Sequence, residues 1–170
     1  HLSTVVFAVN VELEKELGAV QTFFFLGVKK VIFDLHAEIL KRSPVDTGRF
    51  RANNFLTIGS PSTAVLSQKV SKARRKKGAK GKPLELPQFT SARQQRVAEA
   101  QATLDAAFSK GSAATGAAPI SFFITNNLPY AERLENGYSK QAPEGIYRQA
   151  EVVAEIKMKE LESAFERLKL

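Results

Sequence analysis

Apolar side chains recur every three or four residues along two long stretches of the chain. The stretch 11–42 keeps this spacing throughout, and it predicts one long N-terminal helix that ends before Pro44. The stretch 143–168 predicts a long C-terminal helix in the same way. A capping-box pattern at Ser91 opens a middle helix that we expect to reach about residue 109. The side chains expected to face inward from the last helix are Ile146, Ala150, Val153, Ile156, Leu161, Ala164 and Leu168.

Short stretches that are rich in β-branched and apolar residues predict the strands. The first is 2–9, and alternation predicts others at 50–58 and 120–124. A turn at 59–62 predicts a hairpin into a further strand at 64–68. The sequence therefore predicts a single α+β domain over 1–170. Its small, mostly antiparallel sheet of three or four strands packs with the long N-terminal, the middle and the long C-terminal helix.

Three consecutive phenylalanines, Phe23, Phe24 and Phe25, lie in the predicted first helix. Successive helix positions differ by about 100°, so the three rings cover more than half of the circumference. One core-facing stripe cannot bury all of them. Either the helix is enclosed on several sides within its own domain, or another subunit covers the second face.

The positive charge of the chain is concentrated in one segment. Of its net charge of +8, all is carried between Lys69 and Lys82, where eight basic residues occur without an acid, and the remaining basic and acidic residues balance. Glycines and prolines break up regular structure here, so we expect a basic flexible loop at about 69–88. A Gly/Ala/Ser-rich connector is expected at 110–118. The candidate contacts to DNA or to an acidic partner are Lys72, Arg74, Arg75, Lys76, Lys77, Lys80 and Lys82.

Few residues suggest catalysis or metal binding. The chain has no cysteine and two histidines, and His36 is expected to be structural, at the edge of the first helix's apolar stripe. Asp46-Thr47-Gly48 is the tripeptide of aspartic proteases, but Arg49 and Arg51 follow it and would favour the charged carboxylate over a shared proton. We therefore interpret it as a turn and predict no enzyme, no cofactor and no small-molecule substrate. No apolar run approaches the roughly 20 residues that a membrane span needs.

Two sequence blocks carry a resemblance to a known family. Residues 43–53, SPVDTGRFRAN, resemble the P-V-D-T-G-x-L/F-R-x-S/N segment that ends the first helix in tail-completion, or head–tail connector (neck), proteins of long-tailed bacteriophages. Residues 124–137, ITNNLPYAERLENG, are similar to that family's N-x-x-x-Y-A-x-x-x-E-x-G element. A proline-containing loop at 141–145 then leads into the last helix, as in the family. The two blocks occur in the family's order and at compatible spacing.

The resemblance implies a structural role in the virion rather than a reaction. Such proteins form a ring, usually a homohexamer, in the neck at the top of the tail, between the tail-terminator ring and the head connector. DNA passes through the channel of this ring. The chain would be assembled in the cytoplasm of the bacterial host. Candidate residues for contacts with other subunits or partners are Phe23, Phe25, Asp46, Arg49, Arg51, Tyr130, Glu132 and Glu135.

Two alternatives remain open at this stage. The basic segment can make the chain a non-specific DNA-binding protein, although no aromatic side chains are interleaved with the charges for base stacking. The chain can also be another ring protein of the tail, a terminator or a tube subunit. Pairing of Arg49 and Arg51 with Glu132 and Glu135, within a chain or across a ring, is a further hypothesis.

Overall fold

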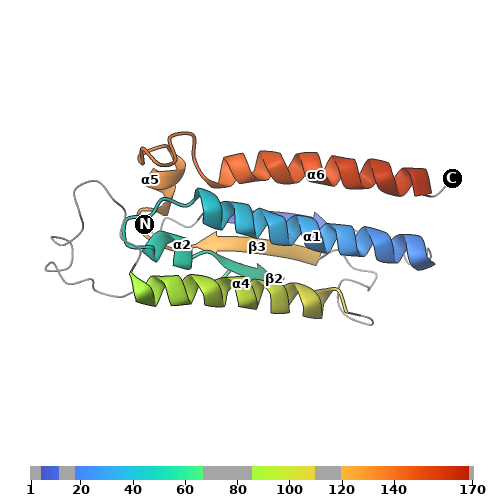
Figure 1. Ribbon diagram of the computed structural model, residues 1–170, viewed down its shortest axis with the longest axis horizontal. Helices are drawn as coiled ribbons and strands as arrows, with labels where there is room; N and C mark the ends of the chain where they lie inside the picture. The colour runs from blue at the N-terminus through green and yellow to red at the C-terminus, as the bar shows by residue number, and fades with distance from the viewer. Residues whose placement is uncertain (1–4, 12–17, 67–85, 110–119, 169–170) are drawn as a thin grey trace, which may run out of the picture.

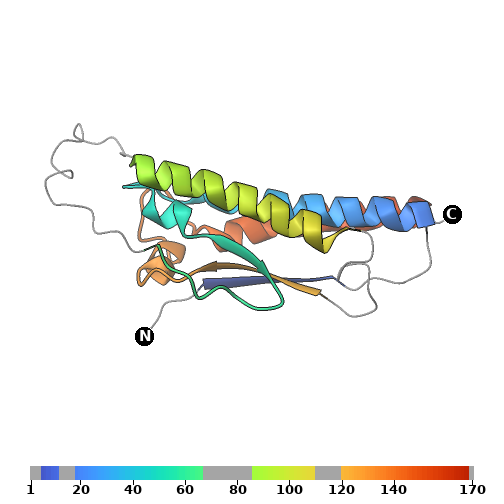
Figure 2. The same ribbon diagram turned by 90° about the horizontal axis from the view of Figure 1, so that it is seen from below.

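Three long helices lie side by side on one face of a three-stranded antiparallel sheet in the computed structural model, which describes residues 5–11, 18–66, 86–109 and 120–168 (Figure 1). Figure 2 shows the helices as one layer and the sheet as the other. The elements follow in the order β1 (Val5–Val11), α1 (Gly18–Arg42), α2 (Arg49–Ala52), β2 (Phe55–Ile58), α4 (Pro87–Ala107), β3 (Ile120–Asn126), α5 (Ala131–Glu135) and α6 (Tyr147–Leu168). The predicted α+β class, with long first and last helices, is confirmed.

The strand β3 lies in the centre of the sheet, in the order β1-β3-β2, and is antiparallel to both neighbours. Because side chains alternate along a strand, Ile120, Phe122 and Ile124 all face the helices, and each is nearly inaccessible to solvent. They form the main core together with α1 residues such as Val28 and Ile32. The alternation read from the sequence at 120–124 is therefore the alternation of the buried central strand.

The helix α1 runs between α6 and α4 and contacts both (Figure 1). On the α6 side, the ring centroids of Phe24 and Phe165 are 4.6 Å apart and Asp34 forms an ion pair with Lys157 at 2.8 Å. On the α4 side, the ring of Phe25 lies 6.4 Å from that of Phe108. Two of the three consecutive phenylalanines therefore contact neighbouring helices of the same chain.

The stretch 50–58 is not one strand, as the sequence had predicted. Its first part forms the short helix α2, which begins after Gly48 at φ 85°, and only the second part forms β2. The predicted hairpin is also wrong for residues 61–66, which form no strand. The carbonyl oxygens of Ser62 and Ala64 instead accept hydrogen bonds from the side chain of Asn127, at 2.8 and 3.1 Å. β2 pairs with β3, which is distant in sequence.

Several helix ends also differ from the prediction. The middle helix begins at Pro87, one turn before Ser91, because proline suits the first position of a helix, so residues 87 and 88 of the predicted loop at 69–88 are helical. The last helix begins at Tyr147, and Ile156 and Leu168 are exposed rather than inward. The first strand continues to Val11, where the first helix was expected to begin. The connector at 110–118 lies outside the described residues.

His36 lies in the core rather than at its edge. It is 1% exposed, and its Nε2 donates a hydrogen bond to the carbonyl oxygen of Asn54 at 3.0 Å. Burial lowers the pKa of His36, and the nearby charge of Arg96 lowers it further, whereas the hydrogen bond to Asn54 raises it. The net effect is a pKa below the ordinary value of 6.5, so the buried ring is neutral in the folded protein at neutral pH.

This burial predicts a loss of stability on mild acidification. As the pH falls below about 6.5, the unfolded chain binds a proton at His36 that the folded chain does not, so the free energy of unfolding falls by up to about 1.4 kcal/mol per pH unit. Urea unfolding at several pH values between 5 and 8 measures this slope. His36→Gln retains a side-chain donor but cannot be protonated, so its stability in this range should depend less on pH. An equal slope in both proteins would contradict this assignment.

Candidate assembly surface

The turn after α1 joins that helix to α2 and exposes Asp46 on the surface. In α2, Phe50 is buried between two arginines whose side chains donate to backbone carbonyls on either side. Arg49 Nε donates to Leu66 O at 3.1 Å, and Arg51 Nη2 donates to Ser43 O at 3.2 Å. The two arginines thus link α2 to Ser43 before it and to Leu66 after it in the sequence.

The second sequence block packs directly on the first. The ring of Tyr130 lies 6.2 Å from that of Phe50, and Ala131 is fully buried. Asn126, at the end of β3, donates from Nδ2 to the carbonyl oxygen of Phe50 at 3.0 Å. The two blocks are more than 70 residues apart in sequence, and the fold brings them together at the end of the molecule where α5 lies (Figure 1).

Asn54 is the centre of the buried polar contacts at this junction. Its Oδ1 accepts hydrogen bonds from the Tyr147 hydroxyl and from Asn126 Nδ2, the latter at 3.3 Å. Its Nδ2 donates to the carbonyl oxygens of Phe50 and Arg51, at 3.1 and 3.2 Å. Burial raises the pKa of Tyr147, so this hydroxyl remains a hydrogen-bond donor. A single side chain therefore ties α2 to β3 and to the first turn of α6.

Glu135, at the end of α5, caps the N-terminus of α6. Its carboxylate accepts hydrogen bonds from the backbone amides of Ile146, Tyr147 and Arg148, at 2.7, 2.8 and 3.0 Å. Gly145 allows this close approach, because a Cβ there would lie 2.7 Å from the carbonyl oxygen of Glu135. A carboxylate at a helix N-terminus satisfies unpaired donors and interacts favourably with the helix dipole. The structure thus gives Glu135 a capping role, which the sequence analysis missed.

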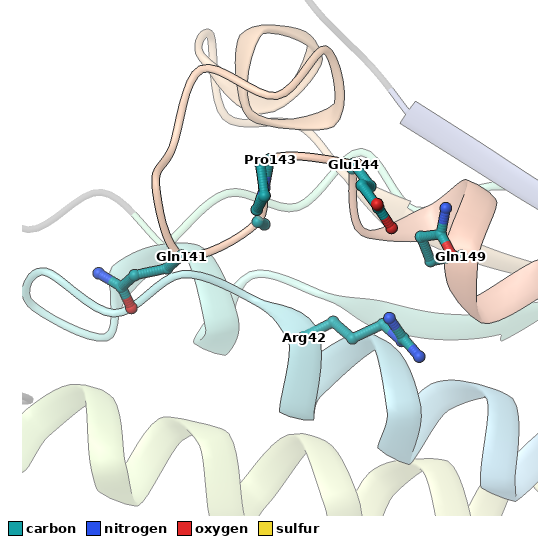
Figure 3. Close-up of a pocket in the computed structure, with 7 residues that line it drawn as sticks. Arg42, Gln141, Pro143, Glu144 and Gln149 are labelled. Carbon is teal, nitrogen blue, oxygen red and sulfur yellow. The ribbon is translucent and has the colours of Figure 1, made fainter.

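A hollow of about 130 Å³ lies between the end of α1 and the loop before α6 (Figure 3). Two of the polar side chains that line it already have hydrogen-bond partners outside the hollow. Arg42 Nε donates to Glu38 at 2.7 Å. Gln141 accepts from the N–H of Val45 and donates to its C=O, both at 3.0 Å. Figure 3 shows Gln141 extending away from Arg42, Glu144 and Gln149. The hollow therefore presents no convergent set of groups for a ligand. Nor do the described residues contain a group of three or more His, Cys, Asp or Glu side chains that could hold a metal ion.

Among the described side chains of the helix layer, the exposed large apolar ones are two pairs that each lie one turn apart, and Leu168 at the end of α6. On α1, Phe23 is 45% and Leu26 59% exposed, and we call this pair the α1 patch. On α6, Val152 is 50% and Ile156 54% exposed, and we call this pair the α6 patch. The outer side of α4 has no large apolar side chain that is exposed. None of the described helices is long and apolar enough to span a membrane.

The predicted interface residues fall into two groups in space. Phe23 belongs to the α1 patch, and Phe25 beside it is half-buried against α4. The other group surrounds the junction of the two sequence blocks and consists of Asp46, Arg49, Arg51, Tyr130, Glu132 and Glu135. The predicted DNA contacts, Lys72, Arg74, Arg75, Lys76, Lys77, Lys80 and Lys82, lie outside the described residues.

Three exposed apolar residues, Leu26, Val152 and Ile156, were missed as candidates. Ile156 has the helical spacing of a core residue, and it was assigned inward for that reason. The sequence of α6 has more apolar positions than one helical stripe can hold, and this excess indicates that some of them are exposed.

Comparisons of the chain with protein-family models, with curated proteins and with solved structures give no match.

The capping role of Glu135 predicts a loss of stability in Glu135→Ala. Three backbone amides at the start of α6 lose their acceptor, so the free energy of unfolding should fall by about 1–2 kcal/mol, as for other N-terminal caps. Glu132 provides the matched control, because it lies on the same short helix but is exposed, and Glu132→Ala should change stability by less than about 0.5 kcal/mol. Urea unfolding of the two variants compares them, and equal losses would contradict the assignment.

Proposed function

We propose that the protein is a structural subunit, not an enzyme, that assembles into a ring in the neck of a long-tailed bacteriophage. The observation that carries the proposal is the pair of exposed apolar patches on α1 and α6. Contiguous apolar surface that the monomer leaves in water is typical of sites of protein association. The packing of the chain accounts for the rings of Phe24 and Phe25, whereas Phe23 and Leu26 retain about half of their surface in solvent.

The junction of the two sequence blocks is a second support. These are the blocks that resemble tail-completion proteins, and the chain packs them on one another through Phe50, Tyr130 and Asn126. Residues that are in contact in the fold are expected to recur together in a family, since each needs the other to be buried. The contact is thus what common descent of the two blocks would produce, and it adds weight to the resemblance.

The proposed position of the ring in the virion comes from the resemblance. The neighbours would be the tail-terminator ring on one side and the head connector on the other, and the genome would pass through the channel. The six-fold stoichiometry also rests on the resemblance. A terminator or tube protein would also form a ring of identical subunits, but that ring would lie at a different position along the tail.

The proposal predicts that Leu26→Glu prevents assembly without unfolding the chain. The side chain is 59% exposed, so a carboxylate there remains hydrated in the monomer but would be buried in an interface, at a high cost in free energy. Mass photometry should show particles of six times 18.7 kDa, or about 112 kDa, for the unmodified chain and monomers for the variant. Ala102→Glu, at an exposed position on α4, is the matched control and should assemble.

Assembly of Leu26→Glu equal to that of the unmodified chain would contradict the role of the α1 patch. The place in the virion has its own test, by electron microscopy of a phage in which the gene is inactivated. The expected defect is free heads beside finished but unattached tails. Tails of abnormal length or tails lacking a tube would favour the terminator or tube alternative instead.

Contact with DNA through the basic segment is a second candidate function. The chain on either side of this segment is tied to the first sequence block. Leu66 N donates to Asn53 Oδ1 at 2.7 Å, and Leu86 N donates to Thr47 O at 2.9 Å. The described residues that flank the segment, Leu66 and Leu86, therefore lie beside the block that resembles the neck proteins.

Removal of the charges should reveal this contact. Up to eight phosphates would be neutralised on binding, so the slope of log K against log salt concentration should approach about −7, and it should fall to about −1 when residues 72–82 are deleted, because Lys69 remains. Filter binding of duplex DNA at several salt concentrations measures the slope. Substitution of the same lysines and arginines by glutamine keeps the length of the segment and is the control for its shape. Unchanged DNA affinity in both variants would exclude this candidate function.

A further inference from the structure

We propose that Asn136 is a site of spontaneous deamidation that the junction of α5 and α6 keeps closed, so that its side chain reacts only when this junction opens. The chain contains a single Asn–Gly pair, Asn136 and Gly137, and Asn136 is exposed at the end of α5. The modification concerns the chemistry of the chain itself and does not depend on the proposed ring.

The reaction needs only these two residues and water. The backbone nitrogen of Gly137 gives up its proton to a base from the solvent and attacks the side-chain carbonyl carbon of Asn136. The bond between that carbon and the side-chain nitrogen breaks, ammonia leaves, and a five-membered cyclic imide remains. Water then opens the imide at either carbonyl and gives aspartate or isoaspartate in place of the asparagine. Glycine makes the pair reactive, because the attacking nitrogen belongs to a residue without a Cβ.

The folded chain keeps the attacking nitrogen occupied. The amide of Gly137 donates to the carbonyl oxygen of Leu134 at 3.2 Å, and the amide of Tyr138 donates to that of Arg133 at 3.2 Å. With Gly137 at φ 80°, this pair of bonds is the Schellman arrangement that ends many helices. The nitrogen that must attack Asn136 is therefore a hydrogen-bond donor in the cap of α5.

The backbone of Asn136 is also held in an unreactive conformation. Closure of the imide ring requires Cβ and the attacking nitrogen to be nearly eclipsed about the Cα–C bond. Asn136 has φ −83° and ψ 18°, which place these two atoms far from that arrangement. Rotation about this bond would break the hydrogen bond from Gly137 and move it away from Pro143, whose carbonyl oxygen leaves no room for a Cβ at Gly137.

Glu135 closes the loop that begins at Asn136. The carboxylate of Glu135 bonds the amides at the start of α6, and its main-chain carbonyl oxygen accepts from Arg148 Nη2 at 3.3 Å. The loop 137–145 therefore leaves from the residue after Glu135 and returns to Glu135 itself. Rotation at Asn136 requires this loop to open. The extent of deamidation in a subunit thus records how long its junction has been open.

Comparison of the protein with a free peptide tests the protection. Trypsin cleaves after Arg133 and Lys140, and the fragment 134–140 contains Asn136 as its only side-chain amide. The protein and a synthetic peptide of this sequence are incubated at mildly alkaline pH, and mass spectrometry of the fragment follows the exchange of the amide for a carboxyl group. The folded protein should react at least about tenfold more slowly than the peptide, because only the open fraction reacts. Equal rates would overturn the proposal.

Two variants on α5 test the role of the junction. Glu135→Ala should speed deamidation of the folded protein about five- to thirtyfold, because the contacts that close the loop are lost and opening becomes easier. Glu132→Ala, on the same short helix, is the matched control and should stay within about twofold of the unmodified chain. A rate that Glu135→Ala leaves unchanged would overturn the gating by the junction. If Glu135→Ala does not fold, the comparison of the unmodified protein with the peptide still decides.

Discussion

The buried amide of Asn54 links elements that are far apart in sequence. It receives the hydroxyl of Tyr147 from α6 and the amide of Asn126 from β3, and it donates to the carbonyl oxygens of α2. Its own backbone carbonyl accepts from His36 of α1. Because a buried polar group without partners destabilises the folded state, these four elements are constrained to meet at one point.

This constraint explains why the two sequence blocks behave as one structural unit. The turn and α2 of the first block fix Phe50 and Asn54, and the second block supplies Asn126 and Tyr130 to them. Glu135 then sets the start of α6, so the direction of that helix depends on the same junction. The α6 patch is thereby held in a fixed relation to the α1 patch.

The three consecutive phenylalanines of α1 differ in how far the neighbouring helices cover them. α4 and α6 flank α1 and cover Phe25 and Phe24, but a helix lying on a sheet between two others keeps one side free. That side carries Phe23 and Leu26. Of the two alternatives considered for this stretch, enclosure within the chain holds for Phe24 and Phe25, and cover of Phe23 by another subunit stays a prediction.

The sequence by itself determined the class of fold, the two long helices and the central strand, because periodicities of 3.6 and 2 depend on local geometry and one dominant burial direction. The sequence also singled out the two blocks, residues 43–53 and 124–137, that meet at the junction. Only the tertiary structure decided that residues 49–52 are helical, that β2 pairs with β3, and that Glu135 is a cap, since each depends on a partner distant in the chain. The same reason applies to Ile156, whose spacing matches a core position. Which apolar stripe of a helix is buried is decided by the elements packed around it, and the sequence of the helix alone does not contain them.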